Sequence, residues 1–220
     1  MSKIVIFGVS QLADLAHFYF EHDSDHEVVA FTVDRNYIIS TEHRGLPVIA
    51  FEDVEEYYSP SENKMFLPIS FKQMSYLRRN KYEAAKAKGY ECVSYISSKA
   101  TTWPDLNVGE NCFIFEDNTI QPFVKIGNNV TLWSGNHIGH HATINDNCFI
   151  SSHVVISGGV NIGKNCFIGV NATLRDHINI GDKCVIGAGT LLLADADAGG
   201  VYMGTATERS KVPSRRLKNI

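Results

Sequence analysis

The second half of the chain carries an aliphatic residue at every sixth position. From Val108 to Leu192, fifteen consecutive sixth positions hold only isoleucine, leucine or valine. Four residues after each of them, a second series is small or branched, apart from Asn118 and Asn136. An α-helix cannot sustain this spacing, whereas hexapeptide repeats are the signature of a parallel β-helix. The pattern therefore predicts a parallel β-helix over this half of the chain.

Three such hexapeptides close one triangular coil, so residues 18 apart are expected to stack on one another. The aliphatic side chains would fill the narrow interior, each contributing about 1.5 to 3 kcal/mol before entropy is counted. We interpret Asn118 and Asn136 as an inward asparagine ladder, with contact to a substrate as the alternative. Four of the five cysteines fall in one interior column, and we interpret them as small buried hydrophobic residues rather than metal or redox groups: Cys112, Cys148, Cys166 and Cys184.

The first hundred residues alternate short β-rich runs with helical patterns. Strands are expected over 3–7, 26–33, 64–70 and 91–96, and helices over 11–20 and 71–88. This alternation predicts a small Rossmann-like parallel sheet, in which ligands bind at the carboxyl ends of the strands. Those ends fall at Gly8 to Ser10, at Asp34 and Arg35, and at Ser70. Because the full GxGxxG pattern is absent, the segment at Gly8 and Ser10 is equally compatible with a structural turn.

The change of pattern near residue 100 divides the chain into an α/β domain over 1–98, a β-helix over 99–195 and a tail over 196–220. The composition, 44% hydrophobic and 20% charged, is that of a soluble globular protein, and no apolar run approaches the roughly 18 residues of a membrane span. A net charge of −4 argues against non-specific nucleic-acid binding. No secretory signal is recognised and no CxxC occurs, so we expect a cytoplasmic location.

The domain order, the segment Val33-Asp34-Arg35 and the run WSGNHIGHH over 133–141 resemble the PglD/NeuD-like sugar acyltransferases. The resemblance covers about residues 3–205 and implies a left-handed β-helix that forms a homotrimer. It also implies acetyl-CoA-dependent N-acetylation of a nucleotide-linked amino sugar, with a 4-amino-4,6-dideoxyhexose expected, in surface glycan synthesis. By family position, six residues would hold the nucleotide end: Ser10, Gln11, Leu12, Asp34, Arg35 and Ser70.

In this family a corner histidine acts as general base and the next residue is acidic. The two positions fall on His140 and His141, so the acidic partner is missing. His140 is expected to point outward, and a surface histidine that only orients the acceptor is the alternative. His141 would either hydrogen-bond His140 as a neutral tautomer or reach a neighbouring subunit. Because an amine needs less help from a base than a hydroxyl, this departure favours N-acylation over O-acylation.

Two further positions are expected to contact acetyl-CoA in the groove between adjacent β-helices. Gly158 lies one coil after His140, where its backbone N–H could hold a thioester carbonyl, with a plain turn glycine as the alternative. The resemblance adds Ala188. The tail could pair with the 3′-phosphate of CoA, with a frayed terminus as the alternative, through a group of basic residues: Arg209, Lys211, Arg215, Arg216 and Lys218.

Three other functions are compatible with a β-helix of this kind. The nearest is O-acetylation of a sialic-acid-like sugar. A zinc carbonic anhydrase would share three histidines across a trimer interface, but His137, His140 and His141 are spaced by three, one and four residues, which does not match that family. We therefore expect no metal. The third alternative is a non-catalytic binding protein, which would fail to bind CoA.

Overall fold

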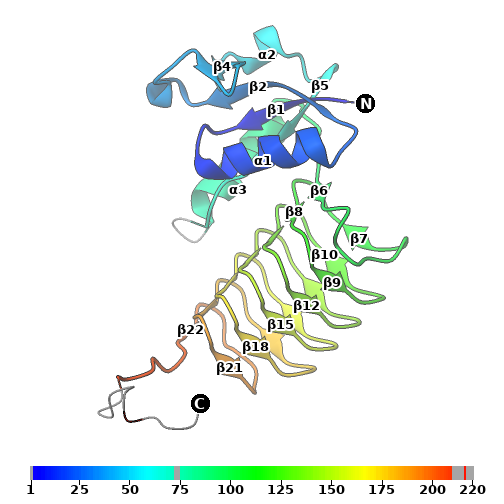
Figure 1. Ribbon diagram of the computed structural model, residues 1–220, viewed down its shortest axis with the longest axis vertical. Helices are drawn as coiled ribbons and strands as arrows, with labels where there is room; N and C mark the ends of the chain where they lie inside the picture. Colours follow the sequence, from blue (N-terminus) through cyan, green and yellow to red (C-terminus); the bar gives the residue numbers. More distant parts are fainter. Residues whose placement is uncertain (1, 72–74, 210–215, 217–220) are drawn as a thin grey trace.

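The computed structural model describes residues 2–71, 75–209 and 216, which form two domains joined end to end (Figure 1). The N-terminal domain has a five-stranded sheet in the order β3-β4-β2-β1-β5. Its strands are β1 (Lys3–Phe7), β2 (Glu27–Val33), β3 (Glu42–His43), β4 (Leu46–Ala50) and β5 (Asn63–Phe66). The helical segments are α1 (Gln11–His22), η1 (Arg35–Tyr37), α2 (Val54–Tyr57) and α3 (Tyr76–Ala87).

The predicted parallel sheet is confirmed, with one antiparallel addition. Strand β1 pairs in parallel with β2 and β5, and β2 pairs in parallel with β4. Neither β4 nor β3, which pairs antiparallel with β4, was predicted from the sequence. Arg44 and Gly45 connect these strands with positive φ angles of 53° and 78°, which suits a two-residue hairpin turn.

Two expected strands are shorter than predicted, because their ends bond to the β-helix. The strand expected over 64–70 ends at Phe66, since the N–H of Leu67 donates to Oδ1 of Asn111 at 2.8 Å. The strand expected over 91–96 is divided between the domains. Cys92 forms a single bridge to Met65, whereas β6 (Tyr95–Ile96) pairs with the first complete coil of the β-helix.

The expected helices are confirmed with shifted ends. Helix α1 continues to His22, two residues beyond the prediction. Helix α3 begins at Tyr76, after Ser75, which has a positive φ of 58°. Residues 72–74, which were expected in this helix, lie outside the described part of the chain.

From β6 (Tyr95–Ile96) to β22 (Val201–Tyr202), the chain forms the predicted left-handed parallel β-helix, with three faces of two-residue strands, and so continues past the expected end at residue 195. Face 1 contains β7 (Asn107–Val108), β10 (Lys125–Ile126), β13 (Thr143–Ile144), β16 (Asn161–Ile162) and β19 (Asn179–Ile180). Face 2 contains β6, β8 (Phe113–Ile114), β11 (Thr131–Leu132), β14 (Phe149–Ile150), β17 (Phe167–Ile168), β20 (Val185–Ile186) and β22 (Val201–Tyr202). Face 3 contains β9 (Thr119–Ile120), β12 (His137–Ile138), β15 (Val155–Ile156), β18 (Thr173–Leu174) and β21 (Leu191–Leu192).

Residues 18 apart pair in register, as expected: Ile138 lies beside Ile120 and Ile156 on face 3. The interior is a continuous column of buried aliphatic side chains. The cysteines of the interior column are all buried, and each thiol donates to a backbone carbonyl, as Cys148 Sγ does to Gly163 O at 3.0 Å. Burial raises the pKa of the Cys148 thiol well above its usual range. These contacts agree with the structural interpretation of the cysteines.

The asparagine ladder is confirmed, because Nδ2 of Asn136 donates to Oδ1 of Asn118 at 2.9 Å. A second ladder was not predicted. Asn111, Asn129 and Asn147 bond side chain to side chain at 2.8 and 2.7 Å along another edge. All three have positive φ angles, a conformation that asparagine adopts more readily than most residues. This edge faces the N-terminal domain, because Asn111 is also the residue that bonds Leu67.

Candidate active site

The predicted nucleotide-side residues gather at one edge of the N-terminal sheet. Ser10 follows β1, Asp34 follows β2, and Ser70 lies a few residues beyond β5, and these three strands are adjacent. Gly8 turns the chain with a φ of 112° while its N–H donates to Thr32 O at 2.8 Å. Ser10 is the exposed N-cap of α1 and makes no capping bond with its side chain. Its hydroxyl and the first N–H groups of α1 are therefore available to an anion.

Asp34 and Arg35 each form an ion pair within the protein. Lys81 on α3 donates to Asp34, and its ammonium lies 5.1 Å above the Phe51 ring. Arg35 donates to Asp53, whose carboxylate raises the pKa of the exposed guanidinium. These pairs fix the segment that follows β2. A cavity of about 210 Å³ adjoins it, lined mainly by apolar groups between Val9 and the segment 37–43.

His140 lies at the edge where face 3 turns into face 1, and its side chain is exposed. The His140 N–H donates to Oε1 of Gln121 at 2.8 Å. The imidazole lies against Gly158, since a methyl carbon added to that glycine would sit 2.7 Å from Cε1 and 2.8 Å from Nε2. Within the described part of the chain, the Gly158 N–H donates to no backbone or side-chain acceptor. A basic nitrogen and an available N–H donor therefore lie side by side.

His141 lies beside His140 at the same corner of the β-helix. Its φ of 59° is the conformation that the corner residues share, and its Nδ1 lies 3.1 Å from Nδ1 of His140. The Phe123 ring packs against the His141 ring, with centroids 4.7 Å apart and planes inclined by 40°. The sequence analysis missed both Gln121 and Phe123. The coil length could have found them, because Phe123 precedes His141 by 18 residues and Gln121 precedes Gly139 by 18.

The other predicted site residues do not converge on His140 within one chain. Ala188 is exposed at the edge between faces 2 and 3, whereas Gly158 lies between faces 3 and 1. No hydrogen bond or cavity found over 2–71, 75–209 and 216 connects Ser10 or Asp34 with His140. In the tail, Arg209 and Arg216 are exposed, whereas Lys211, Arg215 and Lys218 lie outside the described residues.

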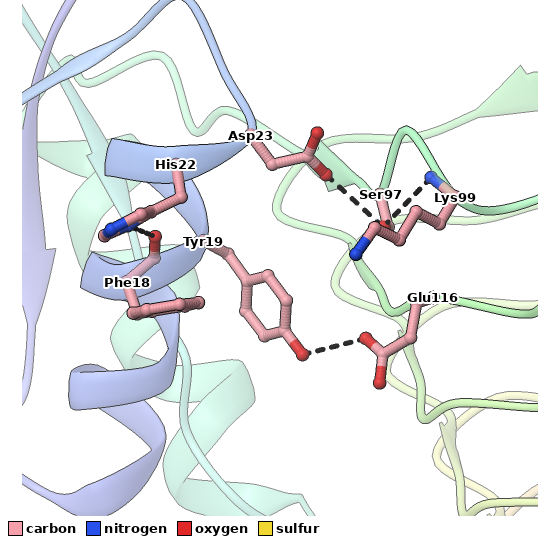
Figure 2. Close-up of a pocket in the computed structure, with 7 residues that line it drawn as sticks. All are labelled: Phe18, Tyr19, His22, Asp23, Ser97, Lys99 and Glu116. Carbon is pink, nitrogen blue, oxygen red and sulfur yellow. Dashed lines mark hydrogen bonds between the residues drawn. The ribbon is translucent and has the colours of Figure 1, made fainter.

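A separate cavity of about 410 Å³ lies between α1 and the first coils of the β-helix (Figure 2). Tyr19 donates to Glu116 across it at 2.8 Å, and burial, together with this carboxylate, raises the pKa of Tyr19 to about 12. Asp23 accepts bonds from Tyr95 Oη at 2.6 Å and from Ser98 N at 2.9 Å. None of the predicted site residues lines this cavity, which belongs to the junction between the domains.

The described residues contain neither a membrane-spanning helix nor a cluster of metal-ligating side chains. No helix among them is long and apolar enough to cross a membrane. Over the same ranges, no group of three or more histidine, cysteine, aspartate or glutamate residues is placed to hold a metal ion.

The repeat region matches two known families of hexapeptide-repeat proteins. Residues 124–158 match the bacterial transferase hexapeptide family, and residues 159–194 match the hexapeptide repeat of succinyl-transferase. No curated protein sequence matches the chain.

Several solved structures share both domains. PerB of Caulobacter crescentus, solved with CoA and GDP-perosamine, has a TM-score of 0.68 at 19% identity, over 93% of this chain and 95% of its own. WeeI of Acinetobacter baumannii AYE has a TM-score of 0.69 at 17% identity, over 93% and 97%. The acetyltransferase domain of PglB from Neisseria gonorrhoeae FA1090, with acetyl coenzyme A, has a TM-score of 0.58 at 19% identity, over 92% and 96%. The fold implied by the resemblance to the PglD/NeuD-like family is thereby confirmed.

Proposed function

We propose that this chain, a hexapeptide-repeat protein with the fold of the sugar acetyltransferases, transfers the acetyl group of acetyl-CoA to the amine of a nucleotide-linked amino sugar. The observation that carries the proposal is the contact between the His140 imidazole and Gly158, whose N–H has no acceptor within the described residues. A related C. crescentus structure is that of a perosamine N-acetyltransferase with CoA and GDP-perosamine, which supports this substrate class. A 4-amino-4,6-dideoxyhexose is the expected sugar, for use in surface glycan synthesis in the cytoplasm.

The chemistry requires a base for the amine and a donor for the thioester oxygen. Nε2 of His140 would take a proton from the amine as the nitrogen attacks the thioester carbon. The Gly158 N–H would donate to the carbonyl oxygen as it gains negative charge. His140 would then return the proton to the sulfur as the C–S bond breaks. His140 therefore makes both proton transfers, from the amine and to the sulfur, and the reaction needs no cofactor besides acetyl-CoA.

The N-terminal domain would hold the nucleotide. The exposed Ser10 hydroxyl and the N-terminus of the 12-residue helix α1 suit a diphosphate. Gln11 and Leu12 continue the same turn, while Asp34, Arg35 and Ser70 complete the edge where the three strands end. The apolar cavity beside Val9 lies next to this edge and suits a base.

One chain leaves this site incomplete, so the proposal includes a homotrimer. His140 and Ala188 occupy different edges of the β-helix, and the nucleotide edge contacts neither of them. In a trimer, the edges of neighbouring β-helices would form the grooves that bind acetyl-CoA. The measurement is the solution mass by light scattering, for which three copies of the 24.4 kDa chain are expected.

The decisive experiment compares wild type with His140→Ala, using acetyl-CoA and GDP-, UDP- and dTDP-linked 4-amino sugars. Loss of a general base should lower turnover by about 100- to 10,000-fold. CoA should still raise the melting temperature of both proteins, because binding to the native state stabilises it. A product that survives mild alkali is an amide, whereas a labile product is the ester of an O-acetyltransferase. Near-wild-type turnover in the variant would exclude His140 as the base, and a wild type inactive with every amino sugar would overturn the proposal.

A further inference from the structure

The pair formed by His140 and His141 is the feature that the proposed function leaves unexplained. The two rings are nearly perpendicular, at 86°, and their Nδ1 atoms are 3.1 Å apart. At this separation one Nδ1 atom donates a hydrogen bond and the other accepts it, because two protonated or two bare nitrogens would repel. The contact therefore ties the tautomer of one imidazole to that of the other.

One contact particular to His141 accompanies this bond, in addition to the backbone geometry that the corners of the β-helix share. Its φ of 59° matches that of other corner residues, such as His153 at 58° and His177 at 60°. Its N–H donates to Pro122 O at 3.3 Å, as corner residues of later coils donate to the coil before them. The particular contact is with Phe123, whose ring packs against the imidazole with the centroids 4.7 Å apart. This ring limits the rotamers that the exposed His141 side chain can adopt.

The surroundings of His140 show which nitrogen needs to be bare. The Cε1–Nε2 edge of His140 lies nearest to Gly158, and Nδ1 is engaged by Nδ1 of His141, so Nε2 is the nitrogen left for a substrate. A base that acts through Nε2 requires the proton on Nδ1. Imidazole in water prefers the opposite tautomer, with the proton on the nitrogen equivalent to Nε2. An acceptor placed at Nδ1 reverses this preference.

We propose that His141 is a positioning residue whose Nδ1 accepts the Nδ1–H of His140 and so holds the Nε2 lone pair of His140 toward the acceptor substrate. This inference rests on the proposed function and deepens it. A neutral imidazole stabilises the His140 cation less than a carboxylate in the same place would. The pair is accordingly matched to an amine, which gives up its proton during attack more readily than a sugar hydroxyl.

The test uses two replacements that tolerate the positive φ of His141. His141→Asn keeps an acceptor, because the amide Oδ1 occupies nearly the same place as the imidazole Nδ1, and asparagine adopts this conformation readily. His141→Gly also fits the backbone but removes the acceptor. His153→Gly is the matched control, since His153 is an exposed histidine with a φ of 58° at a different edge.

We expect His141→Gly to lower kcat by about 10- to 100-fold, the usual cost of removing a partner that orients a functional imidazole. The KM for acetyl-CoA and the stabilisation by CoA should remain unchanged. His141→Asn should stay within a few-fold of wild type, and so should His153→Gly. Nitrogen-15 NMR of the imidazoles should show the His140 proton on Nδ1 in wild type and in the asparagine variant, and a shift toward Nε2 in the glycine variant.

Several results would overturn the inference. Equal kcat for wild type and His141→Gly would show that the acceptor is not needed. An equal loss in the asparagine and glycine variants would show that the ring itself, rather than its acceptor nitrogen, is required. An unchanged His140 tautomer in His141→Gly would also contradict it. A wild type that acetylates no amino sugar would instead refute the proposed function, while the NMR measurement would still decide the tautomer.

Discussion

Gly158 is required by the space around it rather than by its backbone conformation. Its φ is not in the positive range where other glycines of this β-helix are found, such as Gly159 at 68°. The three atoms nearest to an added methyl group all belong to the His140 ring. The His140 side chain could move aside to make room for a methyl group, but this movement would displace the proposed base.

Gly158→Ala should therefore reduce activity without unfolding the protein. The new methyl group would push the His140 ring away from the acceptor, and a displacement of about 1 Å can cost about 100-fold in rate. Stability should stay within about 1 kcal/mol, since alanine suits this backbone. Steady-state kinetics and thermal melting are the measurements. In a His140→Ala background the same change should cause no further loss, and an additive loss would show that Gly158 acts independently of His140.

At the residue scale, the sequence predicted which side chains point outward but not which of them meet. The six-residue period placed His140 at a corner and Gly158 one coil later, and the structure shows them in contact. The hydrogen bond that Gln121 accepts from the His140 N–H and the packing of Phe123 were missed, although both follow from the same coil length. The ion pair of Asp34 with Lys81 could not be predicted in this way, because it depends on how α3 packs.

At the element scale, α3 is fixed to the β-helix by a buried charge without a carboxylate partner. Arg78 is 1% exposed and donates to Thr131 Oγ1 at 2.8 Å, Asn147 O at 2.7 Å and Cys148 O at 3.1 Å. Burial lowers the pKa of this guanidinium to about 10, so it remains charged at neutral pH. The backbone carbonyls it satisfies lie at the corner after β13, which makes Arg78 a specific docking contact rather than a surface residue.

Arg78→Met should lower the free energy of unfolding by about 1 to 3 kcal/mol, because it removes three buried hydrogen bonds from a charged donor. Arg78→Lys should recover part of this loss, since one ammonium cannot reproduce the planar fork of the guanidinium. Urea unfolding followed by tryptophan fluorescence is the measurement. Arg79→Met is the control, because Arg79 is half-buried and its ion pair with Glu83 and its contact with the Tyr76 ring both lie within α3, and it should change stability by less than about 0.5 kcal/mol. Equal effects at positions 78 and 79 would contradict the docking role.

The elements themselves were predictable to different degrees. The repeat strands from β7 to β21 follow from the six-residue period, because one aliphatic residue per hexapeptide leaves no alternative burial, whereas β22 lies in the segment that was expected to be a tail. The strands next to the junction were predicted less well, because their hydrogen bonds go to the other domain: Leu67 bonds Asn111, and Tyr95 bonds Cys112. The hairpin of β3 and β4 has no hydrophobic period of its own to reveal it.

At the scale of the whole molecule, one carboxylate collects several of the hydrogen bonds between the two domains. Asp23 follows α1 and accepts a bond from Ser97, where the chain enters the β-helix (Figure 2). It also accepts bonds from Tyr95 and Ser98. Hydrogen bonds, first from Ser98 and then from Tyr95, lower the pKa of Asp23 from 3.8 to about 2. The sequence could not predict this contact, since Asp23 and Ser98 are 75 residues apart.

The lowered pKa of Asp23 predicts how acid affects the joined domains. A carboxyl group whose pKa is lower in the folded state stabilises that state above its unfolded pKa, and the stabilisation is lost as pH falls through the folded value. For Asp23 this window runs from about pH 4 down to about pH 2. Asp23→Asn lacks this contribution at every pH. Wild type should therefore exceed the variant in melting temperature at pH 5, and the difference should shrink as the pH approaches 2.

Asp25→Asn is the control, because Asp25 is exposed and makes no contact with the β-helix among the described hydrogen bonds, so its difference from wild type should stay small throughout. A gap between wild type and Asp23→Asn that stays constant from pH 5 to pH 2 would show that Asp23 does not connect the domains through its charge.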